Sequence, residues 1–244
     1  MAPGLPKYYF SMTRYVALVP AAGVGSRFGS ESPKQYIPIL GKPMLAHSVE
    51  ALACHPRVDA VVVVLAPGDK WFQQFDWDVS DAKLQFHCVG GATRAESVRN
   101  GLLALEQDIG PDDWVLVHDA ARPCLSKQLI DRLIGTIDDD AVGGLLAVRV
   151  SDTLKQADGG NRVGRTRARD GLWAAQTPQM FRRGLLERAL NELDAGEVTD
   201  ESSAIEALGL QPLLVESATE NLKVTYAEDQ ELAEVILKGR TVCR

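Results

Sequence analysis

Short apolar runs, separated by segments with helical periodicity, organise most of this chain. Residues 16–20, 61–66 and 114–119 are rich in β-branched residues and show little alternation of polar and apolar positions. Such runs are typical of strands that are buried on both faces, as in a parallel sheet. The pattern therefore predicts a sheet with helices packed on both of its faces.

Four segments repeat their apolar residues with the period of an amphipathic helix, namely residues 44–54, 94–106, 181–195 and 226–238. Two of them open with a capping-box sequence, Thr93 to Glu96 and Thr225 to Glu228. Gly196 and Gly239 are expected to end two of the helices. Because strands alternate with helices, we predict an α/β fold with a doubly wound, mostly parallel sheet.

Residues 151–170 break this alternation. The segment is polar, contains a turn-like sequence from Asp158 to Asn161, and carries four arginines. We interpret it as a protruding β-hairpin arm. An isolated two-stranded hairpin is marginally stable in water, so the arm needs support. In one interpretation the arm packs on its own domain or stays flexible. In the other it embraces a second subunit, and the sequence pattern does not decide between them.

The composition is that of a globular protein. The chain has 244 residues, of which 45% are hydrophobic and 24% charged, and its net charge is -7. These values exclude collagen, a coiled coil and a disordered chain. An acidic chain lacks the basic surface that general nucleic-acid binding requires, so we expect no nucleic-acid partner. Since no linker interrupts the chain, we expect a single domain over residues 15–244, after a leader of residues 1–14 without predicted structure.

The four cysteines are Cys54, Cys88, Cys124 and Cys243, and none belongs to a C-x-x-C pair. This spacing gives no support to zinc or thioredoxin-like chemistry, and scattered cysteines suit a reducing compartment. We identify no signal peptide, and no apolar run approaches the ~20 residues that span a bilayer. We therefore expect a cytoplasmic protein that has no membrane partner.

Candidate chemistry follows the strands, because open α/β sheets bind ligands at the carboxyl edge. The loop after the first strand carries the small residues Ala21, Ala22, Gly23 and Gly25. Their backbone amides can face a phosphate closely, and Arg27 and Lys34 add positive charge. The loop matches neither the P-loop nor the dinucleotide fingerprint. On its own it is more typical of a tight turn with two exposed basic residues.

The third apolar run ends at His118 and Asp119. A carboxylate at this edge can hold Mg²⁺ on a nucleotide, or it can cap the following loop. His118 is a candidate base, although a structural histidine is the commoner case at a strand end. Cys124 has no activating partner, so we interpret it as structural. Lys223 precedes the last helix, where a surface lysine or an anion-binding lysine would fit.

Several segments, taken together, resemble one family. They are PAAGVGSRFG with SPKQY, GGATRAESVRNGL, VHDAARP, VSDTLK, AQTPQMF, TDESSAIEALG and ENLKVT. In this order they are similar to the 2-C-methyl-D-erythritol 4-phosphate cytidylyltransferase family, from about residue 15 to residue 238. The resemblance implies a Rossmann-like nucleotidyltransferase fold, a homodimer joined through the hairpin arm, and a requirement for Mg²⁺. It also implies transfer of a cytidylyl group from CTP to 2-C-methyl-D-erythritol 4-phosphate, by in-line attack of the substrate phosphate, with release of pyrophosphate.

The same resemblance implies roles for individual residues. The catalytic residues are Arg27, Lys34, Arg169 and Lys223. The nucleotide-binding residues are Ala21, Ala22, Gly23, Gly25, Gly91, Ser97, Ala120 and Thr177. The substrate-binding residues are Asp119, Arg122, Thr153, Arg169 and Lys223, and Asp119 is also the metal ligand. Thr153 and Arg169 are implied to reach into the partner subunit's site.

Three alternatives stay open. A related nucleotidyltransferase would act on another polyol or sugar phosphate, whereas Thr153 and Arg169 match the methylerythritol pattern. A non-catalytic nucleotide-binding or dimerisation protein is disfavoured because the charged motif residues occur together. An NAD-dependent dehydrogenase is disfavoured, because this chain lacks the acidic residue that dinucleotide binding requires at the end of the second strand. Two positions remain unassigned: Ala92, where some relatives carry a polar side chain, and the carboxylate Glu220.

Overall fold

A computed structural model describes residues 13–23, 32–79, 82–194, 196 and 198–240. Its centre is a seven-stranded sheet in the order β11-β7-β10-β6-β1-β4-β5. The strands are β1 (Tyr15–Ala21), β4 (Ala60–Leu65), β5 (Leu84–His87), β6 (Trp114–Val117), β7 (Gly143–Arg149), β10 (Trp173–Arg182) and β11 (Leu213–Glu216). Neighbouring strands are parallel, except that β10 is antiparallel to both β6 and β7. The predicted α/β fold with a mostly parallel sheet is confirmed.

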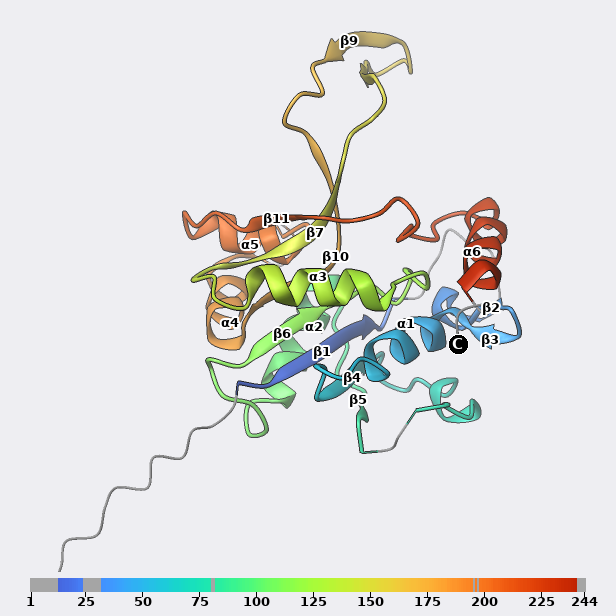
Figure 1. The fold of residues 1–244 in the computed structure, drawn as a ribbon, viewed down its shortest axis with the longest axis vertical. Helices are drawn as coiled ribbons and strands as arrows, with labels where there is room; N and C mark the ends of the chain where they lie inside the picture. The colour runs from blue at the N-terminus through green and yellow to red at the C-terminus, as the bar shows by residue number, and fades with distance from the viewer. Residues whose placement is uncertain (1–12, 24–31, 80–81, 195, 197, 241–244) are drawn as a thin grey trace, which may run out of the picture.

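Helices cover both faces of this sheet (Figure 1). They are α1 (Met44–Ala53), α2 (Arg94–Ala104), α3 (Lys127–Ile137), α4 (Arg183–Glu192), α5 (Glu201–Ala207) and α6 (Ala227–Arg240). Successive residues of a strand point to opposite faces. Accordingly, Ala17 and Val19 of β1 pack with α1 and α3, whereas Val16 and Leu18 pack with α2, α4 and α5. The central strands are therefore buried on both sides, as their apolar sequences predict.

A third apolar cluster joins α6 to the small hairpin of β2 (Pro38–Ile39) and β3 (Lys42–Pro43). Cys124 lies fully buried in this cluster. Burial raises the pKa of its thiol to about 11, which agrees with a structural role. The described residues also include two short 3-10 turns, η1 (Lys34–Tyr36) and η2 (Phe72–Gln74).

Several details of the predicted helices are wrong. Gly196 and Gly239 do not end helices, because α4 ends at Glu192 and α6 continues to Arg240. The helix expected over residues 181–195 starts late, because β10 continues through the buried Phe181 and α4 follows it directly. The expected cap at Thr225 does not form: α6 starts only at Ala227, and the hydroxyl of Thr225 donates to the carbonyl of Lys223. Instead, the carboxylate of Asp229 accepts the backbone N–H groups of Thr225 and Tyr226. The capping box of Thr93 with Glu96 is confirmed at the start of α2.

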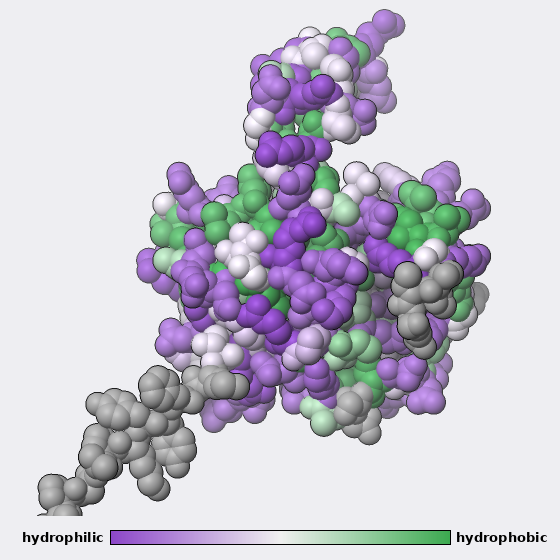
Figure 2. Space-filling model, viewed as in Figure 1, coloured by the Kyte–Doolittle hydropathy of each residue, from purple (hydrophilic) through white to green (hydrophobic). Residues whose placement is uncertain are grey.

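Between β7 and β10 the chain leaves the sheet and forms an antiparallel pair, β8 (Leu154–Ala157) and β9 (Val163–Arg167). This hairpin projects from the body of the molecule (Figure 1), and its surface is mostly hydrophilic (Figure 2). Asn161 takes a positive φ of 57° at the turn. β8 and β9 pair with each other rather than with the large sheet. Whether the arm embraces a second subunit stays a prediction.

Residues 1–12 of the predicted leader lie outside the described residues. Within the described ranges, no helix is both long enough and apolar enough to cross a membrane.

Candidate functional site

A cavity of about 430 Å³ opens at the carboxyl ends of β1 and β6. One part of its lining consists of small or apolar residues: Pro20, Ala21, Ala22, Gly23, Gly91, Ala92, Ala120 and Ala121. The other part is polar: Lys34, Gln35, Thr93, Arg94, Ser97, Asp119 and Lys223. This volume is typical of a site for a small molecule. Its position is the sheet edge at which the sequence predicts a ligand.

Most of the residues that the sequence singles out meet at this cavity. Those in its lining are Ala21, Ala22, Gly23, Lys34, Gly91, Ser97, Asp119, Ala120 and Lys223. Arg122 and Thr177 are buried beside Asp119 and do not belong to the described lining. Thr153 and Arg169 are exposed on the arm segment. Gly25 and Arg27 lie outside the described residues, so their roles stay predictions.

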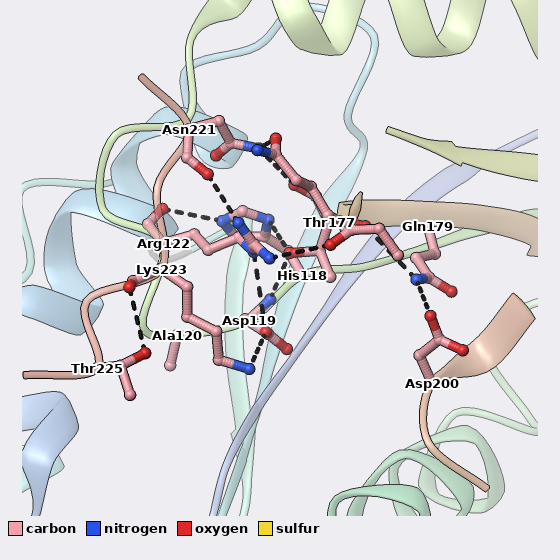
Figure 3. A network of polar contacts seen from close by, with 12 residues as sticks. His118, Asp119, Ala120, Arg122, Thr177, Gln179, Asp200, Asn221, Lys223 and Thr225 are labelled. Atoms are coloured by element: carbon pink, nitrogen blue, oxygen red, sulfur yellow. Dashed lines mark hydrogen bonds and ion pairs between the residues drawn. The ribbon is translucent and has the colours of Figure 1, made fainter. Parts of the chain in front are cut away.

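Asp119 is the centre of a charged network (Figure 3). The Nζ atom of Lys223 lies 2.7 Å from Oδ2, and Nε of Arg94 donates to Oδ1 over 2.8 Å. The Nε atom of Arg122 lies 3.9 Å from Oδ2. Burial alone would raise the pKa of Asp119, but these cations hold it well below its usual range. Asp119 is therefore a carboxylate anion at neutral pH.

Arg94 is a site residue that no local sequence pattern singles out. It is the first residue of α2, and its Nη atoms donate to both carboxylate oxygens of Glu201, over 2.6 and 3.0 Å. Burial opposes its charge, but Glu201 and Asp119 together raise the pKa of Arg94 above its ordinary value. These partners lie 107 and 25 residues away along the chain. Only the three-dimensional fold brings the three side chains together.

His118 lies in a buried hydrogen-bond chain behind Asp119 (Figure 3). The backbone N–H of Asp119 donates to Oγ1 of Thr177, which lies 3.0 Å from Nδ1 of His118. The Nε2 atom of His118 lies 3.2 Å from the carbonyl of Arg122. A neutral imidazole satisfies both contacts, accepting from Thr177 at Nδ1 and donating to Arg122 at Nε2. These contacts agree with a structural histidine rather than a general base.

We expect the imidazole of His118 to titrate near pH 4. Burial lowers its pKa to about 4, and the nearby Asp119 only partly opposes this shift. Because the folded pKa is below the unfolded value of about 6.5, the neutral ring stabilises the fold above pH 6.5. That stabilisation is lost as the pH falls from about 6.5 towards 4. NMR can follow the imidazole resonance that His118→Asn removes, and a midpoint at or above pH 6 would contradict this assignment.

The start of α2 forms one wall of the cavity. The backbone N–H of Gly91 donates to Oγ of Ser97 over 3.1 Å. The N–H groups of Ala92 and Thr93 both donate to Oε2 of Glu96, over 2.6 and 3.2 Å. The amide of Ala92 is thus held by Glu96. The hydroxyl of Ser97 also donates to the carbonyl of Thr93. Ser97 and Glu96 together therefore hold the backbone of residues 91–93 in place.

Lys34 lies on η1, a turn that is held in place by the side chains of Gln35 and Tyr36. The side-chain amide of Gln35 donates to the carbonyl of Ala21 over 2.6 Å, which ties η1 to the end of β1. The hydroxyl of Tyr36 donates to Oδ2 of Asp69 over 3.0 Å. The ring of Tyr36 also stacks against Phe75, with centroids 5.8 Å apart. These contacts set the backbone of η1 beside the cavity.

Among the described residues, no group of three or more His, Cys, Asp or Glu side chains is arranged to hold a metal ion. Asp119 supplies one carboxylate to the cavity, and its neighbour Lys223 has a side chain that is 48% exposed. Mg²⁺ commonly takes one or two protein carboxylates together with substrate phosphates and water. A magnesium ion at this edge would therefore take most of its ligands from phosphates and water, with Asp119 as its carboxylate among the described lining residues. Glu220 pairs with Arg240 at 3.0 Å and borders a different groove.

Comparison with known proteins gives matches along nearly the whole chain. Residues 15–239 match the family model for 2-C-methyl-D-erythritol 4-phosphate cytidylyltransferase. The protein of that name from Dechloromonas aromatica is 56% identical over 229 residues, which are 94% of this chain and 100% of the relative. The protein of that name from Chromobacterium violaceum is 55% identical over 225 residues, which are 92% of this chain and 98% of the relative.

Solved structures agree with these matches. A crystal structure of 4-diphosphocytidyl-2C-methyl-D-erythritol synthase superposes with a TM-score of 0.81 at 41% identity, covering 92% of this chain and 99% of that one. The Francisella tularensis 2-C-methyl-D-erythritol 4-phosphate cytidylyltransferase superposes with a TM-score of 0.78 at 37% identity, covering 92% of this chain and 100% of that one. The similarity thus includes both the sheet and the segments that line the cavity.

Proposed function

The chain belongs to the 2-C-methyl-D-erythritol 4-phosphate cytidylyltransferase family, and we infer its reaction from that membership. It is a nucleotidyltransferase that moves a cytidylyl group from CTP to 2-C-methyl-D-erythritol 4-phosphate and releases pyrophosphate. The observation that supports this chemistry best is the cavity itself, where Lys34, Arg94 and Lys223 lie next to a wall of small residues. The match to relatives named for this substrate favours it over another polyol phosphate.

In this reaction an oxygen of the substrate phosphate attacks the α-phosphorus of CTP. The new P–O bond forms as the bond to the pyrophosphate oxygen breaks, and the bonding electrons leave with pyrophosphate. The attacking phosphate is already an anion, so no general base is needed. The protein's part is to place two anions together and to balance the charge that develops between them. A buried, neutral His118 is consistent with this scheme.

We propose that Lys34 lies against the reacting phosphates, together with Arg27, which is outside the described residues. Lys223 and Asp119 would bind the methylerythritol phosphate. Arg122, which is buried next to Asp119, would help to hold that carboxylate in position. Mg²⁺, when bound at Asp119, would neutralise phosphate charge and make the phosphorus a better electrophile. The small residues around Gly91 leave room for a pyrimidine ring and would exclude a purine by size.

Gly91→Ala is expected to raise the KM for CTP about 10-fold or more. A Cβ atom at this position would lie 2.4 Å from Cβ of Glu96 and 2.8 Å from its Oε2. Glu96 must then move, which releases the amides that it holds and changes the shape of the wall. Steady-state kinetics at saturating second substrate measure this effect. Gly135→Ala on α3 is the matched control, because its Cβ would meet nothing within 4 Å; unchanged kinetics in both variants would contradict the prediction.

We also propose that two copies of the chain pair through the arm, and that Thr153 and Arg169 act in the partner's site. Almost every side chain of β8 and β9 is exposed, so the hairpin lacks the support that two isolated strands need. Leu172, which precedes β10, is exposed, and Leu213 and Leu214 are exposed on the edge strand β11. Apolar side chains also gather near the base of the arm (Figure 2).

We propose a cytoplasmic location without nucleic-acid or membrane partners. Cys54, Cys88 and Cys124 form no disulfide, which suits a reducing compartment. The net charge of -7 disfavours general binding to nucleic acid.

The decisive test supplies CTP, Mg²⁺ and 2-C-methyl-D-erythritol 4-phosphate and measures pyrophosphate release. We expect turnover with CTP that is at least ~10-fold faster than with the other nucleoside triphosphates. Parallel reactions with other polyol and sugar phosphates test the second substrate. If none of these mixtures releases pyrophosphate, or if another phosphate is preferred, the proposed function fails.

A further inference from the structure

Glu201 is a buried carboxylate that lies outside the lining of the cavity. It is the first residue of α5, and its side chain is 1% exposed. A buried carboxylate is costly unless it is paired and hydrogen-bonded. Both of its oxygens are bonded to Arg94, whose side chain reaches from α2 to the cavity. The pair thus joins α5, on one side of the sheet, to the charged network of the site.

The shape of the arginine makes this pairing directional. A guanidinium group is planar, with its N–H donors at fixed angles. Once Nη1 and Nη2 are held by Glu201, the plane is set, and the Nε–H bond points in one direction. That bond donates to Oδ1 of Asp119 over 2.8 Å. A lysine at this position could not hold both carboxylates in this way.

Asp119 consequently has two different oxygens. Oδ1 is occupied by Arg94, and Oδ2 faces the exposed ammonium of Lys223 at 2.7 Å. We propose that Glu201 is a positioning residue that acts through Arg94 to fix the orientation of Asp119, so that Oδ2 keeps facing Lys223 at the cavity. The inference rests on the proposed function, since it requires that Asp119 contributes to turnover.

The experiment is a double-mutant cycle in the cytidylyltransferase assay, with kcat/KM for 2-C-methyl-D-erythritol 4-phosphate as the readout. Glu201→Gln keeps the shape but removes the charge, and we expect it to lower kcat/KM about 10-fold or more. In an Asp119→Asn background the same change is expected to cost less than about threefold, because its effect passes through Asp119. A role in stability alone would give equal losses in both backgrounds.

Glu187→Gln is the matched control, because Glu187 pairs with the nearly buried Arg183 at 2.8 Å on α4. It should leave kcat/KM within about twofold of the wild type. If Glu201→Gln does not fold, Arg94→Lys tests the same link while keeping the positive charge, and the same loss and the same dependence on Asp119 are expected. Equal losses with and without Asp119, or wild-type kinetics, overturn the inference while the function stands. A wild type without turnover removes the proposed function and this inference with it.

Discussion

Lys34→Ala is expected to lower kcat by about 100-fold or more, which corresponds to about 2.7 kcal/mol of transition-state stabilisation. The reaction brings an anionic phosphate against the triphosphate of CTP, and negative charge accumulates on the transferred group. Lys34 lines the cavity on η1, where its charge can be directed at that group. An alanine leaves the cavity open to water, which must reorganise during the reaction, whereas a fixed cation does not.

The anchors of η1 make this loss hard to recover elsewhere. Gln35 and Tyr36 hold the turn through Ala21 and Asp69, so a neighbouring cation cannot take the place of Lys34 by a small backbone shift. We therefore expect kcat to fall much more than KM rises, since the missing interaction is one that strengthens in the transition state.

Steady-state measurement of pyrophosphate release gives both constants. Arg27→Ala, by its family resemblance, is expected to behave like Lys34→Ala. Lys70→Ala is the control, because this lysine is exposed and does not border the cavity. The mechanism loses its main support if both Arg27→Ala and Lys34→Ala stay within threefold of wild-type activity.

The fold was predictable to the extent that local patterns determine it. The strands β1, β4 and β6 and the helices α1 and α2 follow from apolar periodicity and from one capping box. The junction of β10 with α4 was not predictable in this way. β10 is antiparallel within a mostly parallel sheet and runs into the helix without a loop, so Phe181 has an apolar side chain that suits either element.

The same distinction applies to the site. Asp119, Lys34 and Lys223 were found because each follows a strand or precedes a helix in a recognisable motif. Arg94 and Glu201 were not, because their importance comes from contacts between segments 107 residues apart. The family resemblance identified most of the residues that line the cavity. The structure adds Arg94 and Glu201, whose contacts hold Asp119 in place.

The last expected result concerns the arm. Lys34→Ala and Arg169→Ala proteins, each nearly inactive alone, should recover activity when they are mixed and allowed to exchange subunits. If Arg169 acts in the partner's site, each mixed dimer has one site with both substitutions and one site with neither. Random exchange makes half of the dimers mixed, so recovery should approach about one quarter of wild-type activity.

This value separates the two interpretations of the arm. If Arg169 served its own chain's site, every site in a mixed dimer would carry one substitution, and mixing would restore nothing. Subunit exchange is verified by tagging the two variants differently and isolating the doubly tagged species. In that species one of two sites is intact, so its activity should be about half that of the wild type. A doubly tagged dimer without activity would place Arg169 outside the partner's site, and the exposed hairpin would then need another explanation.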